Sequence, residues 1–283
     1  LYTEYGLKNY NNWINVGGFD ALVIRPNGRV MKELTKLSIL NLLHPFQTFI
    51  LGQKNIAPKI ASKFNIKLIF YGENGELEYG GSEKYKNLPK ESTDEWEHEY
   101  FKGASVDTLV KNGIEMGILS KEDLKNPTIS LYKPPSPELI LDQGIEMHWF
   151  SYYNKWIPQE NYYYAAKHTG FINNPEGRSE GTYTKHVSLD DKADGFHWYL
   201  SYMKFGMCRA SRDAQTDIRR HHITRTEGVI LVNRYDGEFP RKHFDWFLNY
   251  VNISEDFFWQ VMDLYRAKSN VWNKVNGKWM MVK

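Results

Sequence analysis

Residues 66–81, IKLIFYGENGELEYGG, decide the fold that the sequence predicts. Residues 66–71 are mostly apolar, which is typical of a buried strand, and Gly72 ends the run. Three carboxylates, one amide and three further glycines follow at once. So much charge with so little side-chain bulk indicates either the rim of a ligand crevice or a solvated acidic turn.

The stretch before this strand alternates between patterns of strand and helix. In chain order the sequence predicts a strand over 19–25, a helix over 30–43, a short strand over 48–51, a helix over 58–64 with Pro58 in its first turn, and the strand over 66–71. This alternation favours an α/β domain with a parallel sheet. Ligands of such sheets bind beyond the carboxyl ends of the strands, where Glu73, Glu76 and Glu78 would hold Mg²⁺ or orient hydroxyl groups.

Composition excludes several classes of protein. The net charge of +2 argues against a general nucleic-acid binder, and the single Cys208 excludes an internal disulfide or a cysteine metal cluster within these 283 residues. No apolar run approaches the length of about 18 residues that spans a bilayer, so no membrane insertion is expected. Cys208 is predicted to be a small buried apolar residue.

The second half of the chain has a different character. Residues 82–137 are rich in charge and proline, which predicts an exposed insertion with one short helix beginning at Ser120, and KPPSP at 133–137 predicts a stiff linker. The predicted domains are therefore 1–137 and 138–283. The second is expected to be mostly helical, with a strand over 145–152, helices over 158–170, 190–205, 239–251 and 254–266, a capping box at Thr224 and Glu227, and a cap at Ser254.

Two polar groups in this half are candidates for binding. The loop over 178–185 mixes cations, a carboxylate and hydroxyls around a glycine, which suits a phosphorylated or glycosidic ligand or else an ordinary solvated loop. Asp190, Asp194 and His197 share one face of the predicted helix over 190–205, where they would bind a metal, relay a proton, or simply complement the helix dipole.

A basic cluster follows, from Arg209 to Arg225. It would clamp phosphates or, as we expect for most of its arginines, pair with Asp213, Asp217 and Glu227.

Seven long stretches, in order from Tyr2 to Trp272, resemble one family. They are YTEYGLKNYNNW, GGFDALVIRPNGRV, LLHPFQTFILGQKN, PKIASKFNIKLIFYGENGELEYGG, GTYTKHVSLDDKADGFHWYLSYMKFG, ITRTEGVILVNRYDGEFPRKHF and FFWQVMDLYRAKSNVW. The chain is similar to the bacterial N-acetyl sugar amidotransferases, relatives of the PP-loop ATP pyrophosphatases that act in making lipopolysaccharide O-antigens and flagellar glycans.

The resemblance implies an α/β fold with a partial Rossmann-like sheet of the PP-loop type, followed by a mostly helical region. Residues 1–137 would be the remainder of the adenylation domain. The family's SGGxDS-type pyrophosphate loop and its cysteine pairs are not in this sequence, so the resemblance implies that Leu1 lies well inside the family's layout. A zinc element would belong to that missing N-terminal part.

The implied activity is ATP-dependent and produces AMP. ATP and Mg²⁺ would adenylate the N-acetyl oxygen of a nucleotide-activated or related sugar, and ammonia would then displace AMP to leave an acetamidino group. The implied partners are the acetamido sugar substrate and a glutaminase with its synthase-like partner, which would supply ammonia in the cytoplasm.

The resemblance and the chemistry together suggest site residues. The catalytic candidates are Lys54, Glu73 and Asn74; the nucleotide candidates are Gly52, Gln53, Gly72, Glu76 and Glu78, with Glu76 and Glu78 as Mg²⁺ ligands; the sugar candidates are Arg178, Glu180, Thr182, Tyr183, Lys185, Asp194 and His197. Gln53 and Lys54 are expected at the end of the strand over 48–51, with Lys54 facing a phosphate.

Two other classes remain open. One is a non-catalytic module that binds a sugar or nucleotide and lacks the pyrophosphate loop. The other is a PP-loop tRNA-modifying enzyme, which ranks last because such enzymes need reactive cysteines and a basic surface.

Overall fold

The computed structural model describes residues 1–72, 87–91 and 104–282, which form two compact units. The sheet unit contains Arg25–Ser38 and Phe46–Trp156. The helical unit contains Leu1–Ile24, Ile39–Pro45 and Ile157–Lys283. Helix α2 (Gly28–Leu42) contributes to both units, and the predicted linker at 133–137 lies within the sheet unit.

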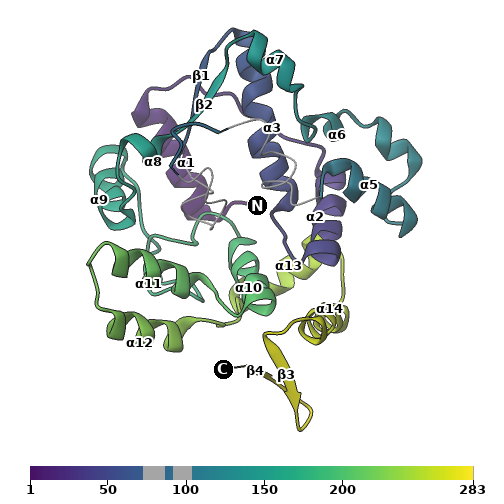
Figure 1. Ribbon diagram of the computed structural model, residues 1–283, viewed down its shortest axis with the longest axis vertical. Helices are drawn as coiled ribbons and strands as arrows, with labels where there is room; N and C mark the ends of the chain where they lie inside the picture. The colour runs from purple at the N-terminus through teal and green to yellow at the C-terminus, as the bar shows by residue number, and fades with distance from the viewer. Residues whose placement is uncertain (73–86, 92–103, 283) are drawn as a thin grey trace. The chain divides into compact units, whose positions relative to one another are not determined.

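The sheet unit places a two-stranded parallel sheet beside helices (Figure 1). Its elements after α2 are α3 (Gln47–Phe64), β1 (Leu68–Tyr71), α5 (Val106–Glu115), the 3₁₀ helix η3 (Lys121–Lys125), α6 (Pro127–Leu131), α7 (Pro137–Asp142), β2 (Glu146–Trp149) and α8 (Phe150–Tyr153). Strands β1 and β2 pair in register from Leu68 opposite Glu146 to Tyr71 opposite Trp149.

The strands alternate between a core face and an outer face, as a period of two requires. Tyr71, Met147 and Trp149 are buried in one apolar core with residues of α2, α3 and α5, whereas Leu68 and Phe70 are exposed. The predicted strand is therefore confirmed, but only one of its faces is buried.

A buried ion pair lies beside this sheet. Pro89 to Glu91 run along β2, where the N–H of Trp149 donates to Pro89 O (3.0 Å) and the N–H of Glu91 donates to Met147 O (2.8 Å). This pairing carries the Glu91 carboxylate to 2.9 Å from Lys54 Nζ. The ammonium group also lies over the rings of Tyr71 and Trp149, 4.3 and 4.1 Å from their centroids, so aromatic faces and a carboxylate together compensate its desolvation.

Helix α3 continues through Pro58 without a break. Proline has no N–H, so the carbonyl oxygen of Lys54, four residues earlier, loses its helical partner. The hydroxyl of Tyr71 donates to that oxygen at 3.4 Å. A strand residue thus supplies a donor in place of the N–H that proline lacks.

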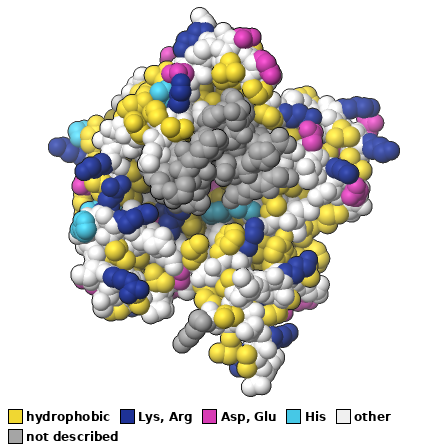
Figure 2. Space-filling view, in the orientation of Figure 1, with side chains coloured by type: hydrophobic (Ala, Val, Ile, Leu, Met, Phe, Trp, Pro, Cys, Tyr) yellow, Lys and Arg dark blue, Asp and Glu magenta, His cyan; other side chains and the backbone are white. Residues whose placement is uncertain are grey.

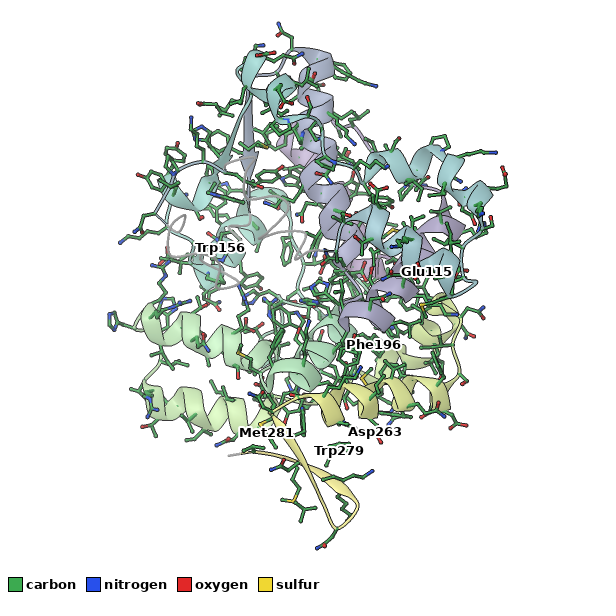
Figure 3. All side chains as sticks on the ribbon, turned by 45° about the vertical axis from the view of Figure 1, so that its right-hand side comes forward. Glu115, Trp156, Phe196, Asp263, Trp279 and Met281 are labelled. Atoms are coloured by element: carbon green, nitrogen blue, oxygen red, sulfur yellow. The ribbon has the colours of Figure 1, made fainter. Side chains whose placement is uncertain are left out.

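The helical unit is built around aromatic side chains. Its elements are α1 (Glu4–Gly17), α9 (Pro158–Thr169), α10 (Asp194–Phe205), α11 (Arg209–Arg219), α12 (Arg225–Tyr235), the 3₁₀ helix η4 (Arg241–His243), α13 (Phe244–Val251), α14 (Glu255–Lys268), and the hairpin of β3 (Trp272–Val275) and β4 (Lys278–Met281). Phe196 stacks on Phe247 with ring centroids 4.0 Å apart, and Phe244 and Phe258 complete this core. Figure 3 labels Phe196 in this core, and Trp279 and Met281 on the hairpin.

The structure confirms the mixed α/β class with a helical C-terminal region. It also confirms the predictions that rest on local chemistry. The helix predicted over 30–43 is α2, with the side chain of Asn27 accepting from the N–H groups of Arg29 and Val30. Thr224 and Glu227 form a capping box, and Ser254 caps α14.

Two predicted strands are wrong. Residues 19–25 form no strand, and Phe19, Leu22 and Val23 are exposed, because alternating apolar residues make a strand only when a partner strand is present. Residues 48–51 belong to helix α3, so Gln53 and Lys54 lie within a helix and not at a strand end. Gly52 and Pro58 resembled breakers but lie inside this helix, with Pro58 far from its first turn.

The predicted insertion over 82–137 is also wrong for the residues that the structure describes. Val106, Leu109 and Val110 of α5 are buried in the core of the sheet unit. The predicted short helix is the 3₁₀ helix η3, which follows Ser120. The hairpin of β3 and β4 was missed, although Asn276 and Gly277 at its turn, both with positive φ, are a strong hairpin signal.

Among the helices of the described residues, none has both the length and the apolar character needed to cross a bilayer.

The buried ion pair yields a stability prediction. We expect Lys54→Met to lower the free energy of unfolding by about 3 kcal/mol or more, because it removes the ammonium group that lies 2.9 Å from the buried carboxylate of Glu91. The matched control is Lys90→Met, which breaks the neighbouring but exposed pair of Lys90 with Glu146 and should cost under about 1 kcal/mol. Urea unfolding followed by circular dichroism measures both. Equal losses in the two variants would show that the buried pair does not stabilise the unit.

Candidate functional site

Asp236 caps helix α11 from a distant part of the chain. Its carboxylate accepts hydrogen bonds from the backbone N–H of Cys208 (3.0 Å), from the N–H of Ser211 (2.9 Å) and from the Ser211 hydroxyl. Cys208 precedes α11 and makes no side-chain cap. Asp236 therefore satisfies the free N–H groups at this helix start and stabilises its positive dipole end.

Glu238, two residues later, holds the loop that was predicted to bind sugar. Arg178 donates to both of its oxygens, at 2.6 and 2.8 Å, and the N–H of Gly181 donates to it at 2.9 Å. The guanidinium group also lies over the ring of Tyr235, 4.4 Å from its centroid. The hydrogen bond with Glu238 raises the pKa of Arg178, so this bidentate pair stays charged.

The hydroxyls of the same loop bond to carboxylates of α11. The Thr182 hydroxyl donates to Asp213 at 3.1 Å, and the Tyr183 hydroxyl donates to Asp217 at 2.7 Å. Thr182 is fully buried. Gly181, with φ of +80°, lets the chain turn here, and its carbonyl accepts from the N–H of Ala210 (3.0 Å). These predicted sugar residues therefore fasten the loop to the helix.

Arg209, the first residue of α11, lies among carboxylates. Its Nε is 3.0 Å from Asp213 Oδ1, and its guanidinium lies over the ring of Trp198, 4.9 Å from the centroid. Burial raises the pKa of Asp213, and the positive charge of Arg209 opposes that rise. The arginine also opposes the rise at Asp194, so one cation serves carboxylates of two segments, the start of α10 and α11.

The acidic turn before α10 differs from its prediction. The helix begins at Asp194, so Asp190 and Asp191 precede it and do not share its face. Asp191 Oδ1 accepts from the N–H of Ala193 at 2.6 Å, and burial raises the pKa of Asp191 to about 7. Burial raises the pKa of Asp194 as well. This turn therefore concentrates carboxylates that are costly to ionise.

Helix α1 holds the acidic turn from its other side. The N–H of Thr3 donates to Asp190 O at 2.9 Å, and the Thr3 hydroxyl donates to Leu189 O while accepting from the N–H of Gly6. A Cβ on Gly6 would lie 2.1 Å from Asp190 O. The glycine of YTEYG is thus required for a close approach between backbones.

His44 is a candidate that the sequence did not single out. Its ring meets that of His197 edge-on, with centroids 4.8 Å apart, and His197 in turn contacts the ring of Trp198. The signal available in the sequence was a single imidazole between the apolar end of α2 and Pro45. His44 and His197 come from two of the stretches that carry the family resemblance, and their contact brings these stretches side by side.

The other sugar candidates lie at the edge of this region. Glu180 Oε1 accepts from the N–H of Lys242 at 3.2 Å, and Lys185 is exposed. Arg178 bonds to the turn after α12, and Thr182 and Tyr183 bond to α11. Lys185 is exposed to solvent.

Three of the nucleotide candidates, Gly52, Gln53 and Gly72, lie in the described part of the sheet unit, and Lys54 follows Gln53 in α3. Gln53 is exposed and Lys54 is buried against Glu91. Gly52 is buried, where a Cβ would lie 3.3 Å from the ring of Tyr132, and Gly72 is exposed at the end of β1. Glu73, Asn74, Glu76 and Glu78 lie outside the described residues. Within the described ranges, no three His, Cys, Asp or Glu side chains are placed to hold a metal ion.

Only some residues of the basic cluster form ion pairs. Arg209 pairs with Asp213 as expected, and His222 Nδ1 lies 3.6 Å from Asp217 Oδ1, whereas Glu227 belongs to the capping box. Arg219 at the end of α11, Arg220 and Arg225 at the start of α12 are exposed, and Figure 2 shows Lys and Arg side chains on the face over these helices. Cys208 is buried, as predicted, and burial raises the pKa of its thiol to about 12, so it is no thiolate nucleophile.

The close approach at Gly6 gives a testable prediction. We expect Gly6→Ala to lower the melting temperature by several degrees, because a methyl group would collide with the backbone of Asp190 and separate α1 from the acidic turn. Gly28→Ala is the matched control, since its Cβ meets nothing within 4 Å and alanine favours the helix. Differential scanning calorimetry compares the two variants. Equal melting temperatures would contradict the close packing.

The acidic turn gives a prediction on pH. The unfolded chain loses the proton of Asp191 near pH 3.8, whereas the folded chain keeps it up to about pH 7. The free energy of unfolding should therefore fall as pH rises through this interval. Asp191→Asn keeps the acceptor for Ala193 and should remove part of that slope, at most about 1.4 kcal/mol per pH unit. Urea unfolding from pH 4 to pH 8 measures it, with exposed Asp245→Asn as control; an unchanged slope in Asp191→Asn would be the contrary result.

Comparison with known proteins adds one finding. The family model of the C-terminal domain of WbpG-like LPS biosynthesis proteins matches residues 180–283, which begin in the fastened loop and run through α10–α14 to the hairpin. No curated protein matches the chain. The match supports a relation of this chain to a family of lipopolysaccharide biosynthesis.

Proposed function

We propose that this protein acts in lipopolysaccharide biosynthesis as an ATP-dependent N-acetyl sugar amidotransferase. The observation that carries the proposal is the match of residues 180–283 to the WbpG-like C-terminal domain. The resemblance of the seven stretches to sugar amidotransferases supports the finer assignment. The proposed reaction takes place in the cytoplasm, on a nucleotide-activated or related acetamido sugar.

The proposed chemistry solves the problem of an unreactive amide. The amide oxygen of the N-acetyl group attacks the α-phosphorus of ATP, and pyrophosphate leaves. Ammonia then adds to the activated carbon, AMP departs with the former amide oxygen, and a proton is lost to give the acetamidino group. Mg²⁺ would neutralise the phosphate charge during the first step. Ammonia would come from a glutaminase and its synthase-like partner.

Two groups of residues are proposed for this chemistry, and each is described by itself. Glu73 and Asn74 would contact nucleotide or sugar, and Glu76 and Glu78 would hold Mg²⁺. In the helical unit, the sugar would bind where the loop of Arg178 meets α10 and α11. Arg178 itself is committed to Glu238, so we propose that it shapes the loop while Lys185 and Asp194 face the ligand.

A non-catalytic module that binds a sugar or a nucleotide is the second candidate. One observation favours it: Lys54, the residue expected to meet a phosphate, is buried in an ion pair with Glu91. An ammonium group held this way supports the core and offers no charge to ATP in the described conformation.

Release of AMP distinguishes the two candidates. The assay supplies ATP, Mg²⁺, ammonium and a panel of nucleotide-linked N-acetyl sugars, and uses both the 283-residue chain and the longest reading frame that contains it. We expect AMP that depends on sugar, and a loss of at least tenfold in Glu73→Gln, which keeps shape and removes charge. Sugar binding without AMP from either form would support the non-catalytic module. Undiminished AMP release by Glu73→Gln would remove Glu73 from the site.

A further inference from the structure

Helix α12 carries apolar residues on the face that it turns to solvent. In its central run, GVILV at 228–232, Val229 is 46% exposed and Ile230 is 60% exposed, whereas Gly228 is buried. A surface helix of a globular protein ordinarily keeps its apolar residues on the face that packs against the core, and polar residues on the other. Two adjacent β-branched residues on the outer face of α12 therefore need an explanation other than the packing of the helical unit.

The inner face of α12 packs against α11. A Cβ on Gly228 would lie 2.6 Å from Ile218 Cδ1 and 3.6 Å from Ala214 Cβ, so the two helices approach closely at this glycine. Figure 1 shows the helices side by side. Each residue turns a helix by about 100°, so Ile230 points nearly opposite to Gly228. Helix α11 therefore cannot cover Ile230.

Arginines lie at both ends of this apolar face. The exposed arginines of residues 219–235 are Arg219, Arg220, Arg225 and Arg234. Arg225 precedes Val229 by four residues and shares its side of the helix. Arg234 follows Ile230 by four residues and does the same at the other end. Within this stretch one carboxylate, Glu227, is exposed, and its side chain bonds to Thr224 in the capping box. The outer surface of the hairpin of α11 and α12 is therefore apolar at its centre and positive around it.

This combination restricts what can cover the surface. A second copy, related by a two-fold axis at Ile230, would bring the arginines of both copies together. A nucleic acid would pair with the arginines, but its phosphates and sugars offer little to two aliphatic side chains. An anionic lipid surface complements both parts, because phosphates meet the guanidinium groups and the acyl boundary receives the aliphatic groups.

We propose that the hairpin of α11 and α12 binds the surface of a membrane that contains anionic phospholipids, without crossing it. Val229 and Ile230 enter the boundary between headgroups and acyl chains, and the four exposed arginines contact lipid phosphates. The inference does not rest on the proposed function, since a chain without amidotransferase activity would bind in the same way.

Sedimentation with vesicles tests the proposal. The 283-residue chain is mixed at low salt with vesicles of phosphatidylcholine alone, or with vesicles in which about one third of the lipid is phosphatidylglycerol. We expect the chain to sediment with the anionic vesicles and much less with the neutral ones. Raising NaCl to about 0.5 M should weaken binding at least tenfold, because salt screens the attraction between exposed charges.

Variants separate the two parts of the surface. Arg219→Gln combined with Arg225→Gln should weaken binding to anionic vesicles about tenfold or more, because two cations are lost from the surface that faces the lipid. Ile230→Gln should weaken it about fivefold or more, because an aliphatic group no longer leaves water. All three positions are exposed, so melting curves followed by circular dichroism should match that of the parent chain.

Matched controls lie elsewhere in the helical unit. Lys268→Gln combined with Lys278→Gln removes the same charge from exposed positions at the end of α14 and in the hairpin of β3 and β4. Leu264→Gln removes a similar aliphatic group from α14, where it is 53% exposed. We expect these controls to keep most of the binding.

A fluorescent label reports insertion directly. Because Cys208 is buried, a thiol-reactive nitrobenzoxadiazole dye should label mainly the added cysteine of Ile230→Cys or of its control, Leu264→Cys. The emission of the dye at position 230 should move to the blue with anionic vesicles, whereas the emission at position 264 should stay in place.

Each contrary outcome overturns the proposal. Equal binding to neutral and anionic vesicles, or no binding to either, would exclude an anionic lipid surface as the partner. Binding that Ile230→Gln leaves unchanged, without a shift of the dye at position 230, would show a contact of charges alone. Self-association in analytical ultracentrifugation that Ile230→Gln abolishes, without vesicle binding, would assign the surface to a second copy. The AMP assay contains no vesicles, so its result stands apart from these.

Discussion

The carboxylate of Asp236 is the constraint on which the candidate site depends. It supplies the cap that Cys208 cannot, so the start of α11 is fixed by a turn that follows α12. Arg209 is the first residue of that helix, and its position near Asp194 and Asp213 follows from the cap. Glu238 extends the same turn to Arg178 and Gly181. Asp236 and Glu238, which are separated by one glycine, therefore fix the positions of Arg209 and of the loop over 178–185.

Gly237 explains why this turn has its sequence. Its φ is +80°, which glycine adopts at little cost, and a Cβ there would lie 2.6 Å from the ring of Tyr202. The DGE sequence thus combines two anchoring carboxylates with the one residue that fits between them. Both acidic side chains of this sequence bond to other parts of the helical unit, whereas Lys185 is exposed to solvent.

Local chemistry made much of the fold predictable. The capping box of Thr224, the cap at Ser254 and the apolar period of α2 each depend on residues within a few positions, and each was predicted correctly. The strand over 19–25 failed because its stability depends on a partner strand. Helix α3 was divided at Pro58 because the donor that compensates for it, Tyr71, is distant in sequence. The sequence likewise could not show that Lys54 meets Glu91, since that contact depends on the pairing of Pro89 to Glu91 along β2.

Residues of the candidate site could be selected from the sequence, but the contacts among them could not. The loop over 178–185 and the acids before α10 were singled out from their residue types, and the structure shows that many of these groups bond to one another. Which carboxylate faces which donor depends on contacts between segments far apart in sequence. His44 and Trp198 were missed because a single imidazole and a single indole carry no local pattern, and their neighbours come from other parts of the chain.

The contact of α1 with the acidic turn has a consequence for the order of folding. The hydrogen bond from Thr3 to Leu189 joins residues 186 positions apart, so it closes a very long loop of chain. Closing such a loop costs entropy that only a largely formed structure repays. We therefore expect the turn that carries Asp190 and Asp191 to reach its final shape late in folding. During synthesis Thr3 leaves the ribosome well before Leu189 does. The contact of α1 with the acidic turn can therefore form only after the residues up to Leu189 have been synthesised.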